Sequence, residues 1–379
     1  MPRSTPPAFN SGKICNIFSF LFIVSYSCFF SIFCFLVESG HESLVLSNGG
    51  VMQETLEEEG TRHITMPIHK KSLLSFRYVW KIRSLLLKEK FDVIHIRSRM
   101  PAWLVYTAWK LVPENKRPRL VSTFHGFYSV NAYSNIMAKG EAIICVSRSV
   151  RNYVLENYPS TRKRVLNVIH RGVDLKEFPY DFQADPEWLN KWKNEGHSFK
   201  DKFVITLPGR ITSWKGHGNF LEILYYLKRD NIPVHGLIIG DVHSKKEEYF
   251  TKLVNSINKL GLSNDITLLP HRTDLREIMT ISDLVVSCST ISEAFGRVTL
   301  EALSLGVPVI AYSHGGVKEQ LEALYPYGII EPNKKSSMRL KIREFYKLKE
   351  KPKPLMNTNF TLEKTNNRIL SVYKRLLSN

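Results

Sequence analysis

The stretch SCSTISEAFGRVTLEALSLGVPVIAY, at residues 287–312, decides the fold of this chain. The apolar run just before it, at 284–286, is typical of a parallel strand that is covered on both faces. Glu293 and Gly296 then stand at the start of a predicted helix, which Gly306 ends. Because a helix N-terminus carries free N–H groups and partial positive charge, a glycine there lets an anionic or hydroxyl-rich ligand approach the backbone. The stretch therefore predicts a strand, a ligand-binding turn, a helix and a second strand.

Cationic residues follow another strand, which is predicted upstream at 203–207. Arg210 and Lys215 lie in the glycine-containing turn after that strand. A glycine turn with two cations, at the carboxyl end of a strand, is where open α/β sheets bind phosphorylated ligands. Glu293 and Glu301 would supply two carboxylates to the same ligand. We therefore expect a site in the second half of the chain for a ligand that carries phosphate and hydroxyl groups.

The alternation of strand and helix patterns predicts an α/β fold with parallel sheets in two Rossmann-like domains. A chain of 379 residues with 43% apolar content can bury two ordinary cores. The predicted organisation is a first domain at 1–182, a polar connection at 183–201, a second domain at 202–348, and a tail at 349–379 with a last helix at 366–377. Strands are expected at 43–46, 63–66, 92–96, 120–123, 142–146 and 165–169, and then at 203–207, 234–239, 266–269 and 284–286.

Eight pieces of the sequence, spread over roughly residues 38–330, resemble glycosyltransferase family 4 in their order and spacing. They are STFHGFYSVNAY, AIICVSRSV, VIHRGVD, PGRITSWKGH, IIGD, LPHRTD, SEAFGRVTLEAL and PVIAYSHGGVKE. The resemblance implies the GT-B architecture, in which two Rossmann-like domains face each other and a C-terminal helix returns to the first domain. The stretch STFHGFYSVNAYSNIMAKGEAIICVS is similar to bacterial lipopolysaccharide-core mannosyltransferases of that family.

The resemblance implies a retaining glycosyltransferase, which moves a hexose from a nucleotide sugar to a hydroxyl group. The expected donor is GDP-mannose and the expected acceptor is a lipid-linked saccharide, the lipopolysaccharide core. A UDP-hexose is the alternative donor, and a degraded, non-catalytic paralogue is the alternative class. A nicotinamide-dependent oxidoreductase is disfavoured, because no G-x-G-x-x-G follows a strand with an acidic residue about 20 positions later.

The resemblance also implies roles for individual residues. Arg210 and Lys215 would hold the diphosphate, and Glu301 would accept hydrogen bonds from the ribose. The catalytic residues would be Glu293, near the positive charge that develops on the sugar, and His125 of STFHG, which would face that sugar. Further donor contacts are expected from the backbone of Phe295, Gly296 and Arg297, from His271 and Arg272 beside the nucleobase, and from Gly315 and Gly316. The alternatives are structural: surface cations, an ordinary helix glutamate, an N-cap carboxylate and a structural histidine.

No metal site or cofactor is expected beyond the nucleotide-sugar substrate. The five cysteines show no paired metal-ligand spacing, and no Asp-x-Asp pair follows a strand to hold a metal against a diphosphate. Neutralisation of the leaving group would therefore fall to Arg210, Lys215 and helix N-termini.

The net charge of +18 suggests anionic partners. Residues 69–90, HKKSLLSFRYVWKIRSLLLKEK, mix basic side chains with aromatic residues and leucines. Such a helix can lie on an anionic membrane surface, where each basic residue contributes about 1 kcal/mol. The alternative is a Rossmann helix with an inward apolar stripe and a solvated basic face. Nucleic acid is not expected, because no recognised binding motif accompanies the charge.

Arg97 and Arg99 follow the strand predicted at 92–96. They are candidates to bind an anionic acceptor, such as the carboxylate of an inner-core sugar acid. The alternative is that they are exposed cations in a loop.

The beginning of the chain departs from the family pattern. Residues 14–37 carry no charged side chain and have the length and apolarity of a transmembrane segment. An anchor, a segment altered by a shifted reading frame and a buried helix all remain open, as does an uncleaved signal sequence. In each case the first strand and its glycine-rich loop are expected to be lost, which puts catalysis in doubt. The expected location is the cytoplasmic face of the inner membrane, either peripheral or with one N-terminal anchor.

Overall fold

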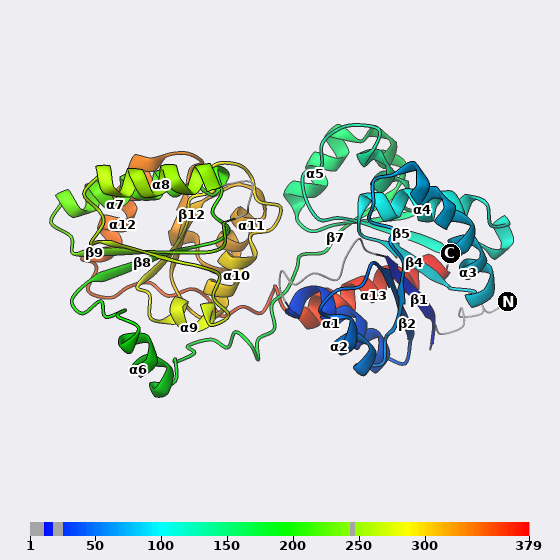
Figure 1. Ribbon diagram of the computed structural model, residues 1–379, viewed down its shortest axis with the longest axis horizontal. Coiled ribbons are helices and arrows are strands. Elements are labelled where there is room, and N and C mark those ends of the chain that lie inside the picture. Colours follow the sequence, from blue (N-terminus) through cyan, green and yellow to red (C-terminus); the bar gives the residue numbers. More distant parts are fainter. Residues whose placement is uncertain (1–10, 18–25, 243–246, 379) are drawn as a thin grey trace, which may run out of the picture. The chain divides into compact units, whose positions relative to one another are not determined.

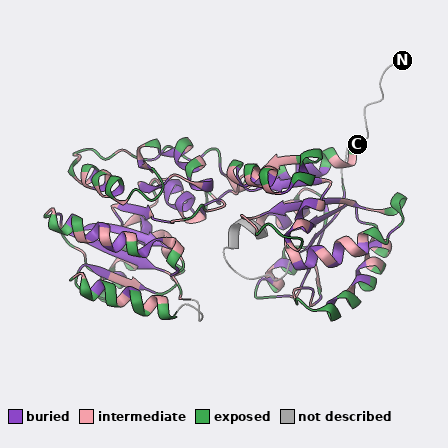
Figure 2. Cartoon of the chain, turned by 90° about the horizontal axis from the view of Figure 1, so that it is seen from above, coloured by how far each residue is buried: buried purple, intermediate pink, exposed green. Residues whose placement is uncertain are grey.

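The computed structural model describes residues 11–17, 26–242 and 247–378. The chain forms two compact units, one from residues 1–172 with 360–379 and the other from residues 173–359. Each unit is a parallel sheet covered by helices, which confirms the predicted α/β fold with two Rossmann-like domains (Figure 1). The inner strands are almost wholly buried, whereas the helices expose their outer faces (Figure 2).

The sheet of the first unit has seven strands in the order β3-β2-β1-β4-β5-β6-β7. All neighbouring strands pair in parallel. The inner strands are short apolar runs buried on both faces, as a doubly covered parallel sheet requires. The strands are β1 Lys13–Ile17, β2 Glu42–Ser47, β3 Arg62–Thr65, β4 Val93–Ile96, β5 Arg119–Phe124, β6 Ala142–Cys145 and β7 Val165–Val168.

The first strand is present, so the expectation that it is lost was wrong. β1 lies in the middle of the sheet and pairs with β2 on one side and β4 on the other. Ile14 and Ile17 are at most 1% exposed, and Asn16 is fully buried. Periodicity cannot separate a short buried strand from an adjoining apolar helix, which is why the sequence read as one continuous segment. The residues after β1, where the family's glycine-rich loop would be expected, are 18–25 and lie outside the described residues.

The described part of the apolar segment 14–37 therefore contains a strand and, from Tyr26 onward, a helix. This helix, α1 Tyr26–Glu38, buries Ile32, Phe33 and Leu36 in the core of the first unit. Within the described ranges, none of the helices combines the length and the apolarity needed to cross a bilayer.

The helices of the first unit fall into two layers. Three of them, α1, α2 Gln53–Glu58 and α13 Leu362–Ser378, share one hydrophobic core with residues of β1, β2, β4, β5 and β6. The opposite face carries α3 Tyr78–Glu89, α4 Arg99–Lys110 and α5 Arg148–Asn157 (Figure 1).

The C-terminal helix α13 belongs to the first unit, as expected of a returning helix. It buries Ile369, Leu370 and Tyr373 in the same core as α1. Its inward face repeats at positions three and four apart, which is the pattern that identified it in the sequence.

The second unit contains a six-stranded parallel sheet in the order β10-β9-β8-β11-β12-β13. Helices α7, α8 and α12 share one core with the sheet, whereas α6 and α9 pack on a second, smaller core. The strands are β8 Phe203–Pro208, β9 Val234–Ile239, β10 Ile266–Leu269, β11 Leu284–Ser287, β12 Val309–Tyr312 and β13 Ile329–Ile330. The helices are α6 Pro186–Asn194, α7 His217–Arg229, α8 Glu247–Lys259, α9 Leu275–Thr280, α10 Arg297–Ser304, α11 Gly315–Leu324 and α12 Lys335–Lys347.

The expected connection at 183–201 is part of the second unit rather than a linker between the units. It contains α6, whose Trp192 is 3% exposed and packs with Val204 and Ile278. Trp188 stacks on Trp192 and donates its indole N–H to Asp274 Oδ2 at 2.8 Å. Trp192 anchors this largely exposed segment on the second unit, although its polar composition predicted a connection between the domains.

Candidate functional site

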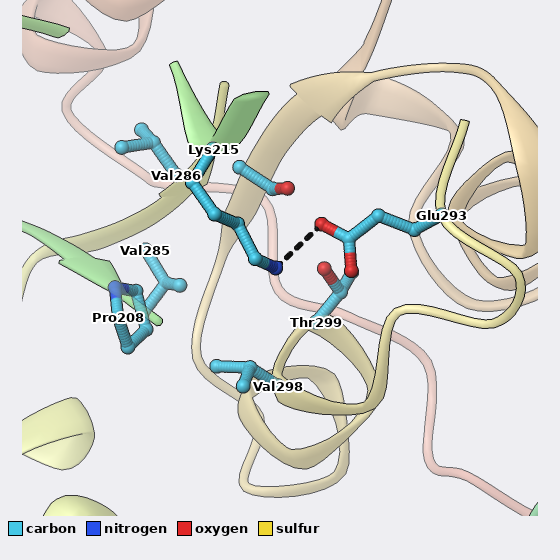
Figure 3. Close-up of a pocket in the computed structure, with 8 residues that line it drawn as sticks. Pro208, Lys215, Val285, Val286, Glu293, Val298 and Thr299 are labelled. Atoms are coloured by element: carbon cyan, nitrogen blue, oxygen red, sulfur yellow. Dashed lines mark hydrogen bonds and ion pairs between the residues drawn. The ribbon is translucent and has the colours of Figure 1, made fainter. Parts of the chain in front are cut away.

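A pocket lies at the carboxyl ends of β8 and β11 in the second unit, beside the N-terminus of α10 (Figure 3). This is the edge at which open parallel sheets bind ligands. Residues of the two strand ends, the two following turns and the first turn of α10 line it: Pro208, Lys215, Val285, Val286, Ser287, Glu293, Val298 and Thr299.

Lys215 and Glu293 point toward each other across this pocket (Figure 3). Lys215 Nζ donates to Glu293 Oε1 at 2.8 Å, and the two side chains are only 15% and 13% exposed. Ser289 Oγ also donates to Glu293 Oε1. The pocket therefore presents a cation and a carboxylate that are already fixed in position.

The turn that carries Lys215 is locked against the chain after β11. Gly216 has φ +77°, and a Cβ there would lie 1.9 Å from the carbonyl oxygen of Cys288. Thr290 donates its N–H to the carbonyl oxygen of Trp214 at 2.8 Å. Only glycine permits this approach, so the contact sets the distance between the lysine and the carboxylate.

The backbone of Glu293 is held by the start of α11. Glu293 forms an isolated parallel bridge with Gly315, and Gly316 N donates to Glu293 O at 2.8 Å. A Cβ on Gly315 would lie 2.0 Å from that oxygen. The pair Gly315 and Gly316 therefore positions the glutamate.

Gly296 caps the N-terminus of α10 with φ +82°. A Cβ there would lie 2.3 Å from Val317 Cγ2, and the preceding residue, Phe295, accepts a 2.6 Å hydrogen bond from Gln320 Nε2 at its carbonyl oxygen. The turn at 293–296 is thus packed tightly on α11. Its position leaves the N-terminus of α10, with its partial positive charge, next to the pocket.

Glu301 is buried in α10, where it is 4% exposed. Arg297 Nε lies 3.0 Å from Glu301 Oε1. Burial raises the pKa of Glu301 to about 7, although the charge of Arg297 opposes the shift. A buried carboxyl group that titrates near neutrality is typical of functional sites.

A second pocket lies in the first unit, at the carboxyl ends of β4, β5, β6 and β7. It combines two arginines, a histidine and two threonines with an apolar wall: Arg97, Thr123, His125, Ile144, Val146, Ile169, Arg171, Thr365 and Ile369. None of these lining residues is acidic, so the pocket favours an anionic group or the oxygen atoms of a saccharide.

Arg171 and His125 interact directly in this pocket. Arg171 Nη2 lies 3.0 Å from His125 Nδ1. Because a guanidinium only donates, Nδ1 is the acceptor and His125 carries its proton on Nε2. Burial, with the charges of Arg171 and Arg97, holds the pKa of His125 well below its ordinary value. His125 is therefore a neutral hydrogen-bond donor.

Arg97 connects this pocket to the centre of the sheet and to the C-terminal helix. It is 6% exposed, and its Nε donates to Asn16 Oδ1 of β1 at 3.3 Å. It also hydrogen-bonds the hydroxyl of Tyr373, which lies 2.6 Å from His95 Nδ1. His95 Nε2 lies 2.6 Å from Thr123 Oγ1. Strand β1 and helix α13 thus orient the guanidinium.

Comparison with known protein families matches each half of the chain to a family model. Residues 32–177 match the Glycosyltransferase Family 4 model, and residues 190–360 match the model of Glycosyl transferases group 1. A crystal structure of a glycosyltransferase from Rickettsia africae is 28% identical, with a TM-score of 0.84 over 98% of this chain and 100% of that one. The chain is a GT-B-type glycosyltransferase.

Two further proteins similar to this glycosyltransferase extend the comparison. The structure of Anabaena HepE in complex with UDP and glucose is 20% identical, with a TM-score of 0.77 over 95% of this chain and 99% of that one. A lipopolysaccharide 1,2-N-acetylglucosaminetransferase of Salmonella typhimurium is 23% identical over 75% of this chain and 73% of its own length. Its name concerns lipopolysaccharide synthesis, as the nearer resemblance of the sequence did, but it does not indicate mannose.

Three other predicted donor residues, Arg210, His271 and Arg272, are not among the residues that line the pocket of the second unit. Arg210 is exposed after β8, and His271 is exposed after β10. Arg272 pairs with Asp274 at 2.7 Å and with Glu195 at 3.1 Å, and its guanidinium lies 5.6 Å from the ring of Trp192. These contacts give Arg272 a structural role on α6.

The structure places the two predicted acceptor residues, Arg97 and Arg99, in different environments. Arg97 lines the pocket of the first unit, but Arg99 does not. Arg99 begins α4, donates to Ser134 Oγ at 3.1 Å, and lies over the rings of Tyr128 and Tyr133 at 4.8 and 5.4 Å. It therefore anchors the loop that follows His125.

Three polar residues of the two sites were not predicted. Ser289 binds Glu293, and His314 Nε2 lies 2.7 Å from the carbonyl oxygen of Ser289. Arg171 contacts His125. A signal existed for all three, because Ser289 follows β11, His314 follows β12 and Arg171 follows β7, each at the carboxyl edge of its sheet.

Proposed function

We propose that the protein is a retaining hexosyltransferase that transfers mannose from GDP-mannose to a lipopolysaccharide-core saccharide. The observation that carries the proposal is the buried pair of Lys215 and Glu293 at the N-terminus of α10. It places a cation for a departing diphosphate beside a carboxylate for a sugar that becomes positively charged. Stabilising both charges is what a nucleotide-sugar transfer needs.

In the proposed reaction, the bond between the anomeric carbon and the diphosphate oxygen breaks, and a bond from that carbon to an acceptor oxygen forms on the same face. The hydroxyl proton of the acceptor leaves with the nucleoside diphosphate. Lys215 and Arg210 hold the diphosphate, Lys215 as a fixed point charge and Arg210 from the exposed rim. No metal ion or further cofactor takes part.

Glu293 and the turn at 295–297 contact the transferred sugar. Thr299 and the N–H groups at the start of α10 add hydrogen-bond donors near the diphosphate. Glu301, buried behind this turn, accepts hydrogen bonds from the ribose hydroxyls, and Gly315 and Gly316 close the pocket.

The first unit supplies the acceptor-side groups. His125, neutral and protonated on Nε2, donates a hydrogen bond to a sugar oxygen. Arg97 and Arg171 favour an acceptor with an anionic substituent, such as the carboxylate of a sugar acid. Arg99 supports this pocket from the loop at 126–134.

A UDP-hexose is the second candidate donor. The HepE structures in complex with UDP and with UDP-glucose support it, because they share this fold. His271 and the other residues at the rim of the second sheet would contact either nucleobase. The main reason to consider a degraded paralogue was the expected loss of the first strand. That reason no longer holds, because β1 is present and orients Arg97 through Asn16.

The deciding experiment compares GDP-mannose and UDP-glucose as donors for the full chain, with lipopolysaccharide-core oligosaccharides as acceptors. The expected product retains the anomeric configuration and forms in the presence of EDTA. Glu293→Gln is expected to lower kcat by about 10²–10³-fold, whereas Glu322→Gln on α11 serves as the control. Nucleotide binding without turnover would instead support the non-catalytic alternative.

The proposed location is the cytoplasmic face of the inner membrane, where a lipid-linked acceptor and a nucleotide sugar meet. The high positive charge of the chain supports peripheral attachment.

A further inference from the structure

Large apolar side chains are exposed together at the start of α3 in the first unit. They lie on the 3₁₀ helix Leu73–Arg77 and in the first turn of α3, into which this 3₁₀ helix runs directly. Leu73 is 89% exposed, Leu74 76%, Phe76 39% and Trp80 64%. Single exposed leucines are common, but four large apolar residues within eight positions indicate a binding surface.

The packing of α3 does not require these residues. Its inward stripe is Val79, Ile82 and Leu86, which are at most 4% exposed and have the spacing of one helix face. The sequence left two readings open, an inward apolar stripe and a membrane-contacting helix. In the structure the two readings apply to different residues. Val79, Ile82 and Leu86 complete the inward stripe, and Leu73, Leu74 and Trp80 remain exposed.

Basic residues surround the exposed apolar group. Lys70, Lys71, Arg77 and Lys81 are all exposed, and residues 69–81 contain no acidic side chain. Lys71 Nζ lies 5.1 Å from the ring of Tyr133, which connects this region to the loop after His125. We call residues 70–81 the basic apolar surface.

We infer that the basic apolar surface docks the protein on an anionic lipid bilayer. Leucine and tryptophan side chains enter the headgroup boundary, while the lysines and the arginine contact anionic headgroups. A bilayer fits better than a folded partner, because charges of a single sign surround apolar tips that protrude. The inference deepens and rests on the proposed function, since a lipid-linked acceptor is held in such a bilayer.

The inference also assigns a function to the loop at 126–134. This loop leads from His125 to Tyr133, and Tyr133 contacts Lys71 of the basic apolar surface and Arg99 of α4. Val130 in the same loop is 57% exposed. An acceptor whose lipid lies in the bilayer would thus have its saccharide near the carboxyl edge of the first sheet.

The test measures sedimentation of the full chain with vesicles of phosphatidylcholine, with and without phosphatidylglycerol. We expect binding that needs phosphatidylglycerol and weakens in high salt. The double variant Leu73→Ser/Leu74→Ser and the double variant Lys70→Glu/Lys71→Glu should each bind at least about tenfold more weakly. Leu355→Ser is the matched control, because Leu355 is 62% exposed in the second unit, and it should bind like the unchanged protein.

Two results would overturn the inference. One is equal vesicle binding by the Leu73→Ser/Leu74→Ser variant and the Leu355→Ser control, with unchanged thermal stability in both. The other is a concentration-dependent dimer that only the Leu73→Ser/Leu74→Ser change abolishes, which would assign the surface to a second copy of the chain. Vesicle binding needs no donor or acceptor, so its outcome is independent of whether the proposed transfer reaction is found.

Discussion

Lys215 Nζ donates to Glu293 Oε1 at 2.8 Å, and this pair joins the turns that follow two neighbouring strands of the second sheet. A buried ion pair adds little net stability, because the loss of hydration offsets the attraction. The pair is better explained by position: each charge keeps the other at the pocket before a ligand arrives. In the proposed reaction the diphosphate then shares Lys215, and Glu293 is released toward the sugar.

The first prediction concerns the coupling of these two residues. Lys215→Met and Glu293→Gln should each lower kcat/KM by about 10²-fold or more, since each removes a charge that faces the transition state. The double variant should lose much less than the product of the two, because both act in one unit. A double-mutant cycle on kcat/KM measures this. Fully multiplicative losses would show that the ion pair is not part of the transfer machinery.

A second prediction uses the raised pKa of Glu301. Burial moves this pKa from 4.5 to about 7. The folded protein therefore binds more protons than the unfolded chain between these values, and its stability falls as the pH rises from about 5 to about 8. The loss is at most about 3 kcal/mol, and Glu301→Gln should remove it.

Urea unfolding of the unchanged protein, Glu301→Gln and the exposed control Glu350→Gln, at pH 5 and pH 8, checks this. We expect the pH dependence to shrink only in Glu301→Gln. An identical pH dependence in all three proteins would mean that Glu301 is ionised throughout.

The third prediction concerns the proton of His125. Arg171→Lys keeps a donor to Nδ1 and should preserve the Nε2-protonated ring. Arg171→Glu supplies an acceptor instead, so Nδ1 must carry a proton and the low pKa of His125 should rise. Nitrogen-15 NMR of the histidine rings across a pH titration distinguishes these states. Arg162→Glu, an exposed change in the same unit, should leave the His125 signals unchanged; if it moves them equally, the contact with Arg171 does not set the tautomer.

A fourth prediction tests the glycine contact behind Glu293. Gly315→Ala should destabilise the second unit by about 2–4 kcal/mol and reduce activity, since φ is positive and the new Cβ meets Glu293 O at 2.0 Å. Gly218→Ala in α7 is the control: nothing lies within 4 Å of its Cβ position, so it should stabilise the helix by up to about 1 kcal/mol. Thermal unfolding and kcat measure both effects, and a harmless Gly315→Ala would contradict the tight bridge.

Much of the fold could be predicted because parallel strands buried on both faces are short apolar runs. Residues 203–207 and 284–286 show this pattern clearly, and the structure confirms strands there. The missed strand β1 is also buried, but an apolar segment follows it in the sequence without a charged residue between them. Periodicity then gives no boundary, and only pairing with β2 and β4 defines the strand.

The site was predictable where one rule sufficed: polar residues after parallel strands gather at one sheet edge. This rule selected Lys215 and Glu293, which the structure brings into contact. It also selected Arg272, whose ion pair with Glu195 depends on the fold of α6 and could not be seen from local sequence. Arg171 satisfies the same rule, but only the tertiary contact with His125 reveals what it does.

The return of α13 to the first unit has a consequence for biosynthesis. Residues 173–359 are continuous, so the second unit has all its parts while the first still lacks the helix that supplies Tyr373 and covers β1 and β5. During translation, the first unit can therefore complete its hydrophobic core only after residues 360–378 have been synthesised. Until then one face of its sheet is only partly covered, by α1 and α2, and its apolar residues are open to chaperones and to aggregation.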